Sequence, residues 1–257
     1  MSSSSLLAVK NLSVDFGGLR ALNDVYFELK REEVVGVIGP NGAGKTTLFN
    51  ALCGLVKPST GELTLDGKSH KWPRADQLVN FGIARTLQGV GLFSDLTVVE
   101  NVMVGAKKFS HSGFFAAVLG LNVKDERKLQ ERAMLALERV YATGLANRRA
   151  DTLSYPDTKR VAIARALVSE PTILMLDEPA GGLGAEDIDW MNSLIHNLKL
   201  QCSVLLVEHH MDVVMSGCDR LYVLNFGEVI SSGHAETVRR DPAGIAAYWG
   251  AGWARTL

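Results

Sequence analysis

The chain has 257 residues, of which 47% are hydrophobic and 21% are charged, and its formal net charge is −1. These values suit one large globular domain or two small ones with a sizeable buried core, and they give no indication of nucleic-acid binding. The N-terminal residues MSSSSLLAVK lack the basic and apolar regions of a secretory signal. The longest interior apolar run, GFFAAVLGL, is shorter than the roughly 20 residues that a membrane span needs. If the protein works at a membrane, we therefore expect a partner to cross the bilayer.

The first part of the chain has the patterns of β-strands. LLAVKNLSVDF and LNDVYFELK alternate between apolar and polar residues, and the segment GGLRA is expected to form the turn between them. EVVGVIG (33–39) is a continuous apolar run, which is typical of a strand buried on both faces. A glycine-rich loop follows, then TTLFNALCGL with helical spacing, and then the short strand GELTLDGK with an Asp-Gly turn.

The middle of the chain is helical and the remainder alternates. From about residue 97 to 149 the pattern is that of helices, and residues 125–141 place Leu129, Ala133, Leu137 and Val140 on one face. Strand patterns in TILMLDEP and SVLLVEHH then flank the amphipathic helix DIDWMNSLIHNL, and RLYVLNFGEVISSG has the pattern of a hairpin. Strands that alternate with helices indicate an α/β fold with a parallel sheet, into which the helical middle is inserted.

Residues 39–47, GPNGAGKTT, match the phosphate-loop pattern G-x-x-x-x-G-K-[ST], with a buried strand before them and a helix after them. The glycines let the backbone N–H groups surround phosphate oxygens, and the helix N-terminus adds a positive dipole end. Lys45 can reach the β and γ phosphates, and the Thr46 hydroxyl can bind Mg²⁺. The predicted nucleotide-binding residues are Gly39, Pro40, Asn41, Gly42, Ala43, Gly44, Lys45, Thr46 and Thr47.

Two further groups follow apolar strands. Asp177 and Glu178 end TILMLDE at the carboxyl edge of the sheet, where open α/β sheets bind their ligands. Asp177 is expected to hold Mg²⁺ through its second shell, and Glu178 to take a proton from water or to orient it. Alone, these two acids could simply begin a helix. His209, at the end of the next strand, is a candidate for a γ-phosphate contact, and His210 is its competitor.

With these motifs the chain resembles the ATP-binding subunit of an ABC transporter over nearly its whole length. The resemblance implies a P-loop NTPase of the ABC ATPase type, with a mixed sheet core, an N-terminal antiparallel β part and an inserted helical subdomain. A single domain is expected, with its α/β core at 6–88 and 160–240, the helical subdomain at 89–159 and a tail at 241–257. Phe16 lies where the family stacks an aromatic ring on adenine, although it could be an ordinary strand residue. Gln88 matches the loop glutamine that contacts Mg²⁺ or the attacking water.

Within that family, the chain is most similar to the importers of branched-chain amino acids. The phrases that carry this likeness are FGGLRALNDV, IGPNGAGKTTLFNALCGL, RTLQGVGLFSDLTVVENV, MLDEPAGGL and VRRDPAGIAAYWG. Residues 105–128 resemble the extra length of the larger ATPase subunit of that group. The phrases leave the cargo open, since ATPases of urea and lipopolysaccharide transporters share many of them.

The family signature L-S-G-G-Q closes on the γ-phosphate of ATP held by the other subunit, and here it reads LSYPD (153–157). Ser154 keeps the phosphate-binding position. Pro156 lacks the backbone N–H of the glycine that it replaces, and Asp157 puts a negative charge near an anion. The same residues resemble a capping box with proline in the first helical turn. Gly184 stands where the family often has an aspartate that links the two sites of the dimer.

The resemblance implies ATP binding and Mg²⁺-dependent hydrolysis, coupled to import of branched-chain or similar amino acids. The implied partners are transmembrane permease subunits, a second ATPase subunit in a homo- or heterodimer and, indirectly, an external solute-binding protein. The implied location is the cytoplasmic face of the inner membrane.

A regulatory subunit that binds ATP but hydrolyses little remains an alternative, because of Pro156, Asp157 and Gly184. A cassette acting in translation or repair fits less well, since the chain has neither a basic patch nor a coiled coil. Residues 109–121 are expected either to pack on the helical subdomain or to contact the permease, with Phe114 and Phe115 as the residues to test.

Overall fold

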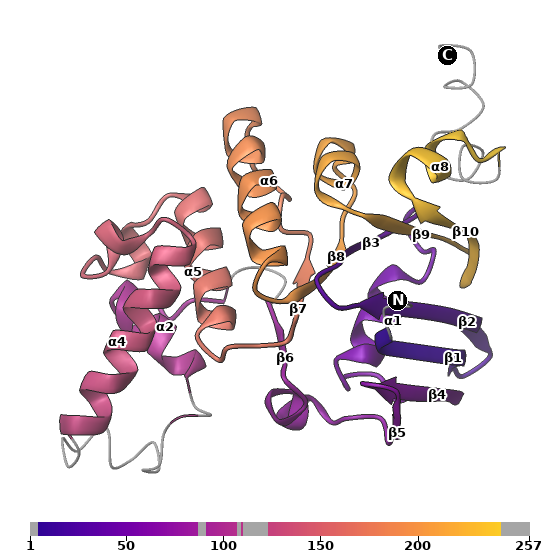
Figure 1. Ribbon diagram of the computed structural model, residues 1–257, viewed down its shortest axis with the longest axis horizontal. Coiled ribbons are helices and arrows are strands. Elements are labelled where there is room, and N and C mark those ends of the chain that lie inside the picture. The colour runs from indigo at the N-terminus through magenta and orange to yellow at the C-terminus, as the bar shows by residue number, and fades with distance from the viewer. Residues whose placement is uncertain (1–4, 87–90, 107–108, 110–122, 243–257) are drawn as a thin grey trace. The chain divides into compact units, whose positions relative to one another are not determined.

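The computed structural model describes residues 5–86, 91–106, 109 and 123–242 (Figure 1). The chain forms two compact units. The larger consists of Met1–Leu78 and Met175–Leu257, and the smaller is the intervening segment Val79–Leu174. The smaller unit is thus an insertion within the larger one, with wider limits than the expected 89–159.

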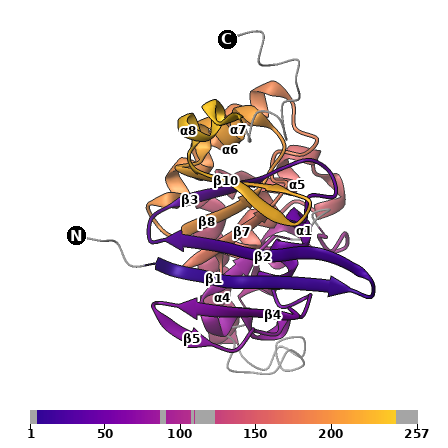
Figure 2. The ribbon, with the colours of Figure 1, turned by 90° about the vertical axis from the view of Figure 1, so that its right-hand side faces the viewer.

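An antiparallel sheet is formed by the N-terminal part of the larger unit. Its strands are β1 (Ser5–Phe16), β2 (Leu19–Lys30), β4 (Thr60–Leu65) and β5 (Lys68–His70), in the order β2-β1-β4-β5 (Figure 2). The expected five-residue turn GGLRA is wrong. Phe16 pairs with Leu19, so a two-residue Gly-Gly turn closes the hairpin and residues 19–21 already belong to β2. Short glycine turns of this kind match the twist of paired strands, and so the strand resumes at once.

The second sheet has the strand order β10-β9-β3-β8-β7-β6. Its strands are β3 (Val34–Ile38), β6 (Ile83–Arg85), β7 (Ile173–Asp177), β8 (Ser203–Val207), β9 (Arg220–Asn225) and β10 (Glu228–His234). β3 pairs in parallel with both β8 and β9, and every residue of β3 and β8 is buried. This arrangement confirms the predicted α/β fold with buried parallel strands.

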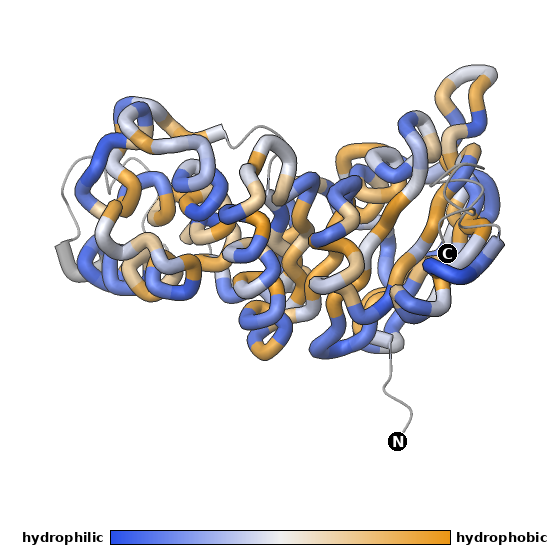
Figure 3. Tube along the Cα trace, turned by 90° about the horizontal axis from the view of Figure 1, so that it is seen from above, coloured by the Kyte–Doolittle hydropathy of each residue, from blue (hydrophilic) through white to orange (hydrophobic). Residues whose placement is uncertain are grey.

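Within its described residues, the larger unit contains four α-helices. They are α1 (Lys45–Leu52), α6 (Ala185–Lys199), α7 (Met211–Gly217) and α8 (Ala235–Arg240). α6 is the amphipathic helix expected from its sequence, and it buries Met191, Leu194, Ile195 and Leu198. Colouring by hydropathy shows hydrophobic and hydrophilic stretches in close alternation along the chain (Figure 3), as expected of elements with one buried and one exposed face.

The smaller unit is mainly helical. It contains α2 (Val98–Gly105), α4 (Val123–Arg139) and α5 (Tyr155–Leu167), and short 3₁₀ turns at Thr143–Leu145 and Ala150–Thr152; a further 3₁₀ segment, Ala75–Phe81, crosses the boundary between the units. Of the four residues predicted to share one face, Ala133, Leu137 and Val140 are buried and Leu129 is half-buried. Of the segment 109–121, only Phe109 lies within the described residues, where the Arg132 guanidinium lies 3.8 Å from its ring centroid. Among the described helices, none is long and apolar enough to cross a membrane.

A largely buried charge network joins β2 to β9 within the larger unit. The Arg220 guanidinium on β9 makes two hydrogen bonds of 2.9 Å to the Glu33 carboxylate, and it also donates to the Glu28 carboxylate on β2 at 2.9 Å. The Tyr222 hydroxyl accepts from Arg220 at 3.0 Å and from the Glu28 N–H at 3.1 Å, and burial raises the pKa of Tyr222 to about 12. The side chains of Arg220, Glu28 and Glu33 are only 15%, 21% and 13% exposed, so each charge depends on its partners.

Replacing Arg220 should therefore destabilise the larger unit severely. In Arg220→Met, Glu28 and Glu33 stay largely buried without their cation, and we expect the free energy of unfolding to fall by about 3–5 kcal/mol in a urea titration. Arg31→Met is the matched control, because Arg31 pairs with Asp66 on the surface, where both side chains are more than half exposed, and its loss should be below about 1 kcal/mol. Equal losses in the two variants would contradict this role for the network.

Candidate functional site

The phosphate loop, residues 39–47, connects the carboxyl end of β3 to the start of α1. Gly39 has φ +151°, and a Cβ there would lie 2.2 Å from the Leu224 carbonyl oxygen. Gly44, which precedes α1, has φ +104°, and a Cβ there would lie 2.9 Å from the Ala21 carbonyl oxygen. Both positions thus need glycine for conformation and for space. The backbone takes the tight path that lets N–H groups face an anion.

Neighbouring backbone holds the loop from outside. The Ala43 carbonyl accepts a hydrogen bond from the Gly227 N–H at 3.0 Å, and the Gly227 carbonyl accepts one from the Asn23 N–H at 2.9 Å. Within the loop, the Ala43 N–H donates to the Pro40 carbonyl at 3.2 Å. The loop is thereby fixed to the turn between β9 and β10 and to β2.

Lys45 and the threonines form the first turn of α1. The Lys45 side chain is buried, and its Nζ donates to the carbonyl oxygens of Gly39 at 2.6 Å and Pro40 at 2.9 Å. Burial lowers the pKa of the Lys45 ammonium, and the negative charge of Glu178 opposes that shift. Thr46 is exposed and Thr47 half-buried, while Asn41 and Gly42 are exposed at the loop's tip. A cation thus lies at the base of the loop, and hydroxyl groups lie at the N-terminal end of a helix.

The two acids occupy the end of β7. Asp177 is its last residue, and the Glu178 N–H donates to the Val207 carbonyl at 2.9 Å, which joins the carboxyl ends of β7 and β8. Glu178 has φ +47°, a backbone conformation that is uncommon for a residue with a side chain. Such strain is found mainly where the surrounding structure fixes a functional residue.

His209 follows β8 and lies beside Glu178. Its Nδ1 is 3.7 Å from Glu178 Oε1, and its side chain is half exposed. His210 immediately precedes α7, and its ring centroid is 4.5 Å from that of His209. The larger unit therefore brings together Lys45, Glu178 and His209, three of the side chains expected at the site. The same His209 Nδ1 also lies 3.5 Å from the Oε2 atom of Glu208, so this ring contacts two acids.

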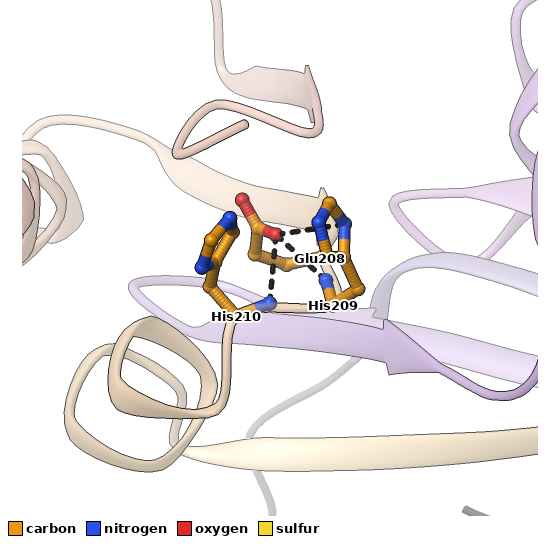
Figure 4. Close-up of side chains that lie close together, drawn as sticks. All are labelled: Glu208, His209 and His210. Atoms are coloured by element: carbon orange, nitrogen blue, oxygen red, sulfur yellow. Dashed lines mark hydrogen bonds and ion pairs between the residues drawn. The ribbon is translucent and has the colours of Figure 1, made fainter. Parts of the chain in front are cut away.

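Glu208 was missed by the sequence interpretation. Its side chain is fully buried, and its carboxylate accepts hydrogen bonds from the N–H groups of Ala180 at 2.8 Å, His209 at 2.6 Å and His210 at 3.0 Å (Figure 4). The sequence offered no clear signal for this burial, because glutamate is rarely fully buried, and one of the hydrogen-bond donors that this carboxylate needs, the Ala180 N–H, comes from a segment that only the fold brings near it. Potential metal-ligand atoms of Glu208, His209 and His210 lie within 4.8 Å of one another. Both carboxylate oxygens already accept backbone N–H groups, so backbone anchoring explains this cluster better than a metal does.

Phe16 and Gln88 complete the expected set for the nucleotide. Phe16 ends β1 at the hairpin, and the residue is 51% exposed, so its ring is accessible for stacking. Gln88 lies outside the described residues.

The altered signature begins α5 in the smaller unit. Ser154 is the N-cap, and its hydroxyl oxygen accepts the Asp157 N–H at 3.3 Å. The same hydroxyl donates to the Asp157 carboxylate at 2.7 Å, and the Asp157 carboxylate lies 4.0 Å from the Arg160 guanidinium. Pro156 lies in the first turn, where a missing N–H does not break the helix. Gly184 precedes α6 in the larger unit and is exposed.

Comparison with known proteins places the chain in a family. Residues 22–181 match the family described as ABC transporter. The chain is 41% identical over 252 residues to the high-affinity branched-chain amino acid transport ATP-binding protein LivG of Salmonella typhimurium, covering 96% of this chain and 99% of LivG. It is 40% identical to BraF of Pseudomonas aeruginosa, another high-affinity branched-chain amino acid transport ATP-binding protein, covering 95% and 98% of the two chains.

Solved structures agree with this placement. The ADP conformation of MJ1267, an ATP-binding cassette of an ABC transporter, superposes with a TM-score of 0.84 at 29% identity, over 96% of this chain and 99% of that one. The dimeric structure of MJ0796, a bacterial ABC transporter cassette, gives a TM-score of 0.74 at 28% identity, over 89% and 98% of the two chains. The resemblance predicted from the sequence is confirmed, and the chain belongs to the ABC transporter family.

Proposed function

We propose that this chain is the ATP-binding and ATP-hydrolysing subunit of an ABC importer for branched-chain or related amino acids. The observation that carries the proposal is the convergence of Lys45, Glu178 and His209 at the carboxyl ends of neighbouring strands. The relatives that match nearly the whole chain are named as ATP-binding proteins of branched-chain amino acid transport, which supports the cargo class. We further propose that both units together form one ABC ATPase domain.

The phosphate loop and the start of α1 bind the triphosphate in this proposal. The loop N–H groups and the Lys45 ammonium contact its β and γ phosphates, and Phe16 stacks on its adenine. Thr46 and Gln88 would supply oxygen donors that suit Mg²⁺, and Asp177 would act on the ion from its outer coordination sphere. When bound, Mg²⁺ neutralises charge that develops on the phosphates.

Glu178 and His209 act on the water and the γ-phosphate. Glu178 accepts a proton from the attacking water or orients it, and the adjacent His209 contacts the γ-phosphate. The uncommon backbone conformation of Glu178 fits a residue held in place for chemistry.

In the transporter, we propose that two ATPase subunits enclose two ATP molecules, each between one phosphate loop and the other subunit's signature. The dimeric MJ0796 cassette supports such an arrangement. Permease subunits would carry the cargo across the bilayer, an external binding protein would deliver it, and this subunit would lie at the cytoplasmic face. A regulatory subunit with little turnover is the second candidate. It is favoured by the Ser154 hydroxyl, which donates to Asp157, and by the missing N–H of Pro156.

Lys45→Ala should weaken ATP binding. Removing a charge-assisted phosphate contact is worth about 1.5–3 kcal/mol, or roughly 10- to 150-fold in Kd, measurable by calorimetry with the purified chain. Lys68→Ala, at an exposed position on β5, is the control and should leave Kd unchanged. An unaltered Kd in Lys45→Ala would refute the proposed phosphate site.

Glu178→Gln should abolish turnover while ATP still binds. The amide cannot accept the proton, and loss of a general base costs about 10²–10⁴ in kcat, measured as phosphate release by the reconstituted transporter. Glu186→Gln, in the first turn of α6, is the matched exposed control. Activity that survives in Glu178→Gln would remove Glu178 as the base.

Pro156→Ala and Pro156→Gly should both raise the ATPase rate of the reconstituted transporter. Each restores a backbone N–H in the first turn of α5, and one donor to a developing charge is worth at most about 10²–10³ in rate. The alanine variant matters because glycine weakens a helix by about 1 kcal/mol. If neither variant is faster than the wild type, the signature is not limited by Pro156.

A further inference from the structure

Glu208 connects two parts of the site through one carboxylate. It follows β8, and its Oε1 accepts the Ala180 N–H at 2.8 Å, two residues beyond Glu178. Its Oε2 accepts the N–H groups of His209 and His210, at 2.6 and 3.0 Å (Figure 4). One oxygen thus anchors the turn after β7, and the other anchors the segment after β8.

The turn after β7 is fixed at three points. The Glu178 N–H donates to the Val207 carbonyl at 2.9 Å, and the Glu178 carbonyl accepts the Gly181 N–H at 3.1 Å. The Ala180 N–H donates to Glu208, which is the contact made by a side chain. Glu178 keeps its left-handed φ inside this turn, and strained residues persist only where their surroundings over-determine them.

The donors around Glu208 suit a charged group. A fully buried carboxylate is strongly disfavoured unless it accepts several hydrogen bonds, and three backbone N–H groups supply them. Backbone donors cannot move away as a flexible side chain can. The carboxylate therefore sets how far the Glu178 turn lies from His209, whose Nδ1 is 3.7 Å from Glu178 Oε1.

We infer that Glu208 is a positioning residue, which keeps Glu178 and His209 at the separation that the hydrolysis of ATP requires. This inference rests on the ATPase function proposed above. Glu208 acts through three backbone N–H groups and through its Oε2, which also lies 3.5 Å from the His209 Nδ1. Because misplacing a reacting group by about 1 Å can reduce a rate 10²-fold, the Glu178–His209 geometry is expected to depend on this carboxylate.

The test is Glu208→Gln in the complete transporter. Glutamine keeps the size of the side chain, but it has one acceptor oxygen and an NH₂ group that cannot accept. It can therefore accept hydrogen bonds either from the Ala180 N–H or from the N–H groups of His209 and His210, but not from both. We expect kcat to fall roughly 10- to 100-fold, while the Kd for ATP changes less than about threefold. Slower turnover with unchanged binding separates a positioning role from a general loss of structure.

Glu33→Gln is the matched control. Glu33 is a largely buried glutamate of the same unit, with a side chain 13% exposed, and it pairs with Arg220 and accepts the Lys30 N–H at 2.7 Å. The Glu33→Gln substitution should lower the free energy of unfolding and leave kcat unchanged. If Glu208→Gln behaves in the same way, with a change in stability alone, the positioning role is refuted.

A second comparison identifies the residues through which Glu208 acts. In a His209→Ala background, Glu208→Gln should change kcat much less than it does in the wild type, because the two residues act as a unit. Full additivity would overturn the inference.

If Glu208→Gln does not fold, Glu208→Asp is the deciding variant. A native unfolding profile with reduced kcat supports the positioning role, and unchanged kcat refutes it. An inactive wild-type transporter would refute the proposed function itself, whereas an active wild type with an unaffected Glu208→Gln refutes only the positioning role.

Discussion

The close approach of backbone to backbone around residues 39–44 is the constraint on which the candidate site depends. Gly39 lies so near the Leu224 carbonyl that no side chain fits, and the Ala43 carbonyl is held by Gly227, which is in turn held by Asn23. Two distant segments, β2 and the end of β9 with its turn, therefore hold the loop from outside through backbone groups, and the Lys45 ammonium binds the Gly39 and Pro40 carbonyls from inside. Because backbone groups have little freedom to rearrange, the N–H groups of the loop and the start of α1 are organised before any ligand arrives.

Most of this site could be predicted, because its residues obey local rules. The glycine and lysine spacing of the phosphate loop is a contiguous pattern, and the apolar runs before Asp177 and His209 place both residues at strand ends. The parallel core and the buried face of α4 followed from periodicity in the same way. The N-terminal hairpin departed from expectation only in its turn, since glycine pairs signal a turn more readily than they fix its length.

The features that escaped prediction depend on contacts between segments far apart in the sequence. Ala180 and Glu208 are 28 residues apart, and periodicity carries no information about which buried N–H groups an acid will reach. The backbone conformation of Glu178 is likewise a property of the folded turn, since no propensity rule assigns a left-handed conformation to glutamate. For Asp157 the sequence left two interpretations open, a charge facing an anion and a member of a capping box. The structure pairs it with the N-cap residue Ser154 and places its carboxylate 4.0 Å from the Arg160 guanidinium.

The hydrogen bonds of Glu208 also bear on how this sequence can drift in evolution. At positions 180 and 210 the carboxylate uses the main chain, so the identity of those side chains is not specified by this contact. Any residue that keeps a backbone N–H preserves the anchor, and proline alone removes it. This contact therefore lets related sequences vary at position 210, with proline excluded, while the acid at 208 stays fixed; at position 180 the full burial of Ala180 further limits the size of the side chain. Such a pattern of variation would indicate that the carboxylate at position 208 is kept mainly for its hydrogen bonds to main-chain N–H groups.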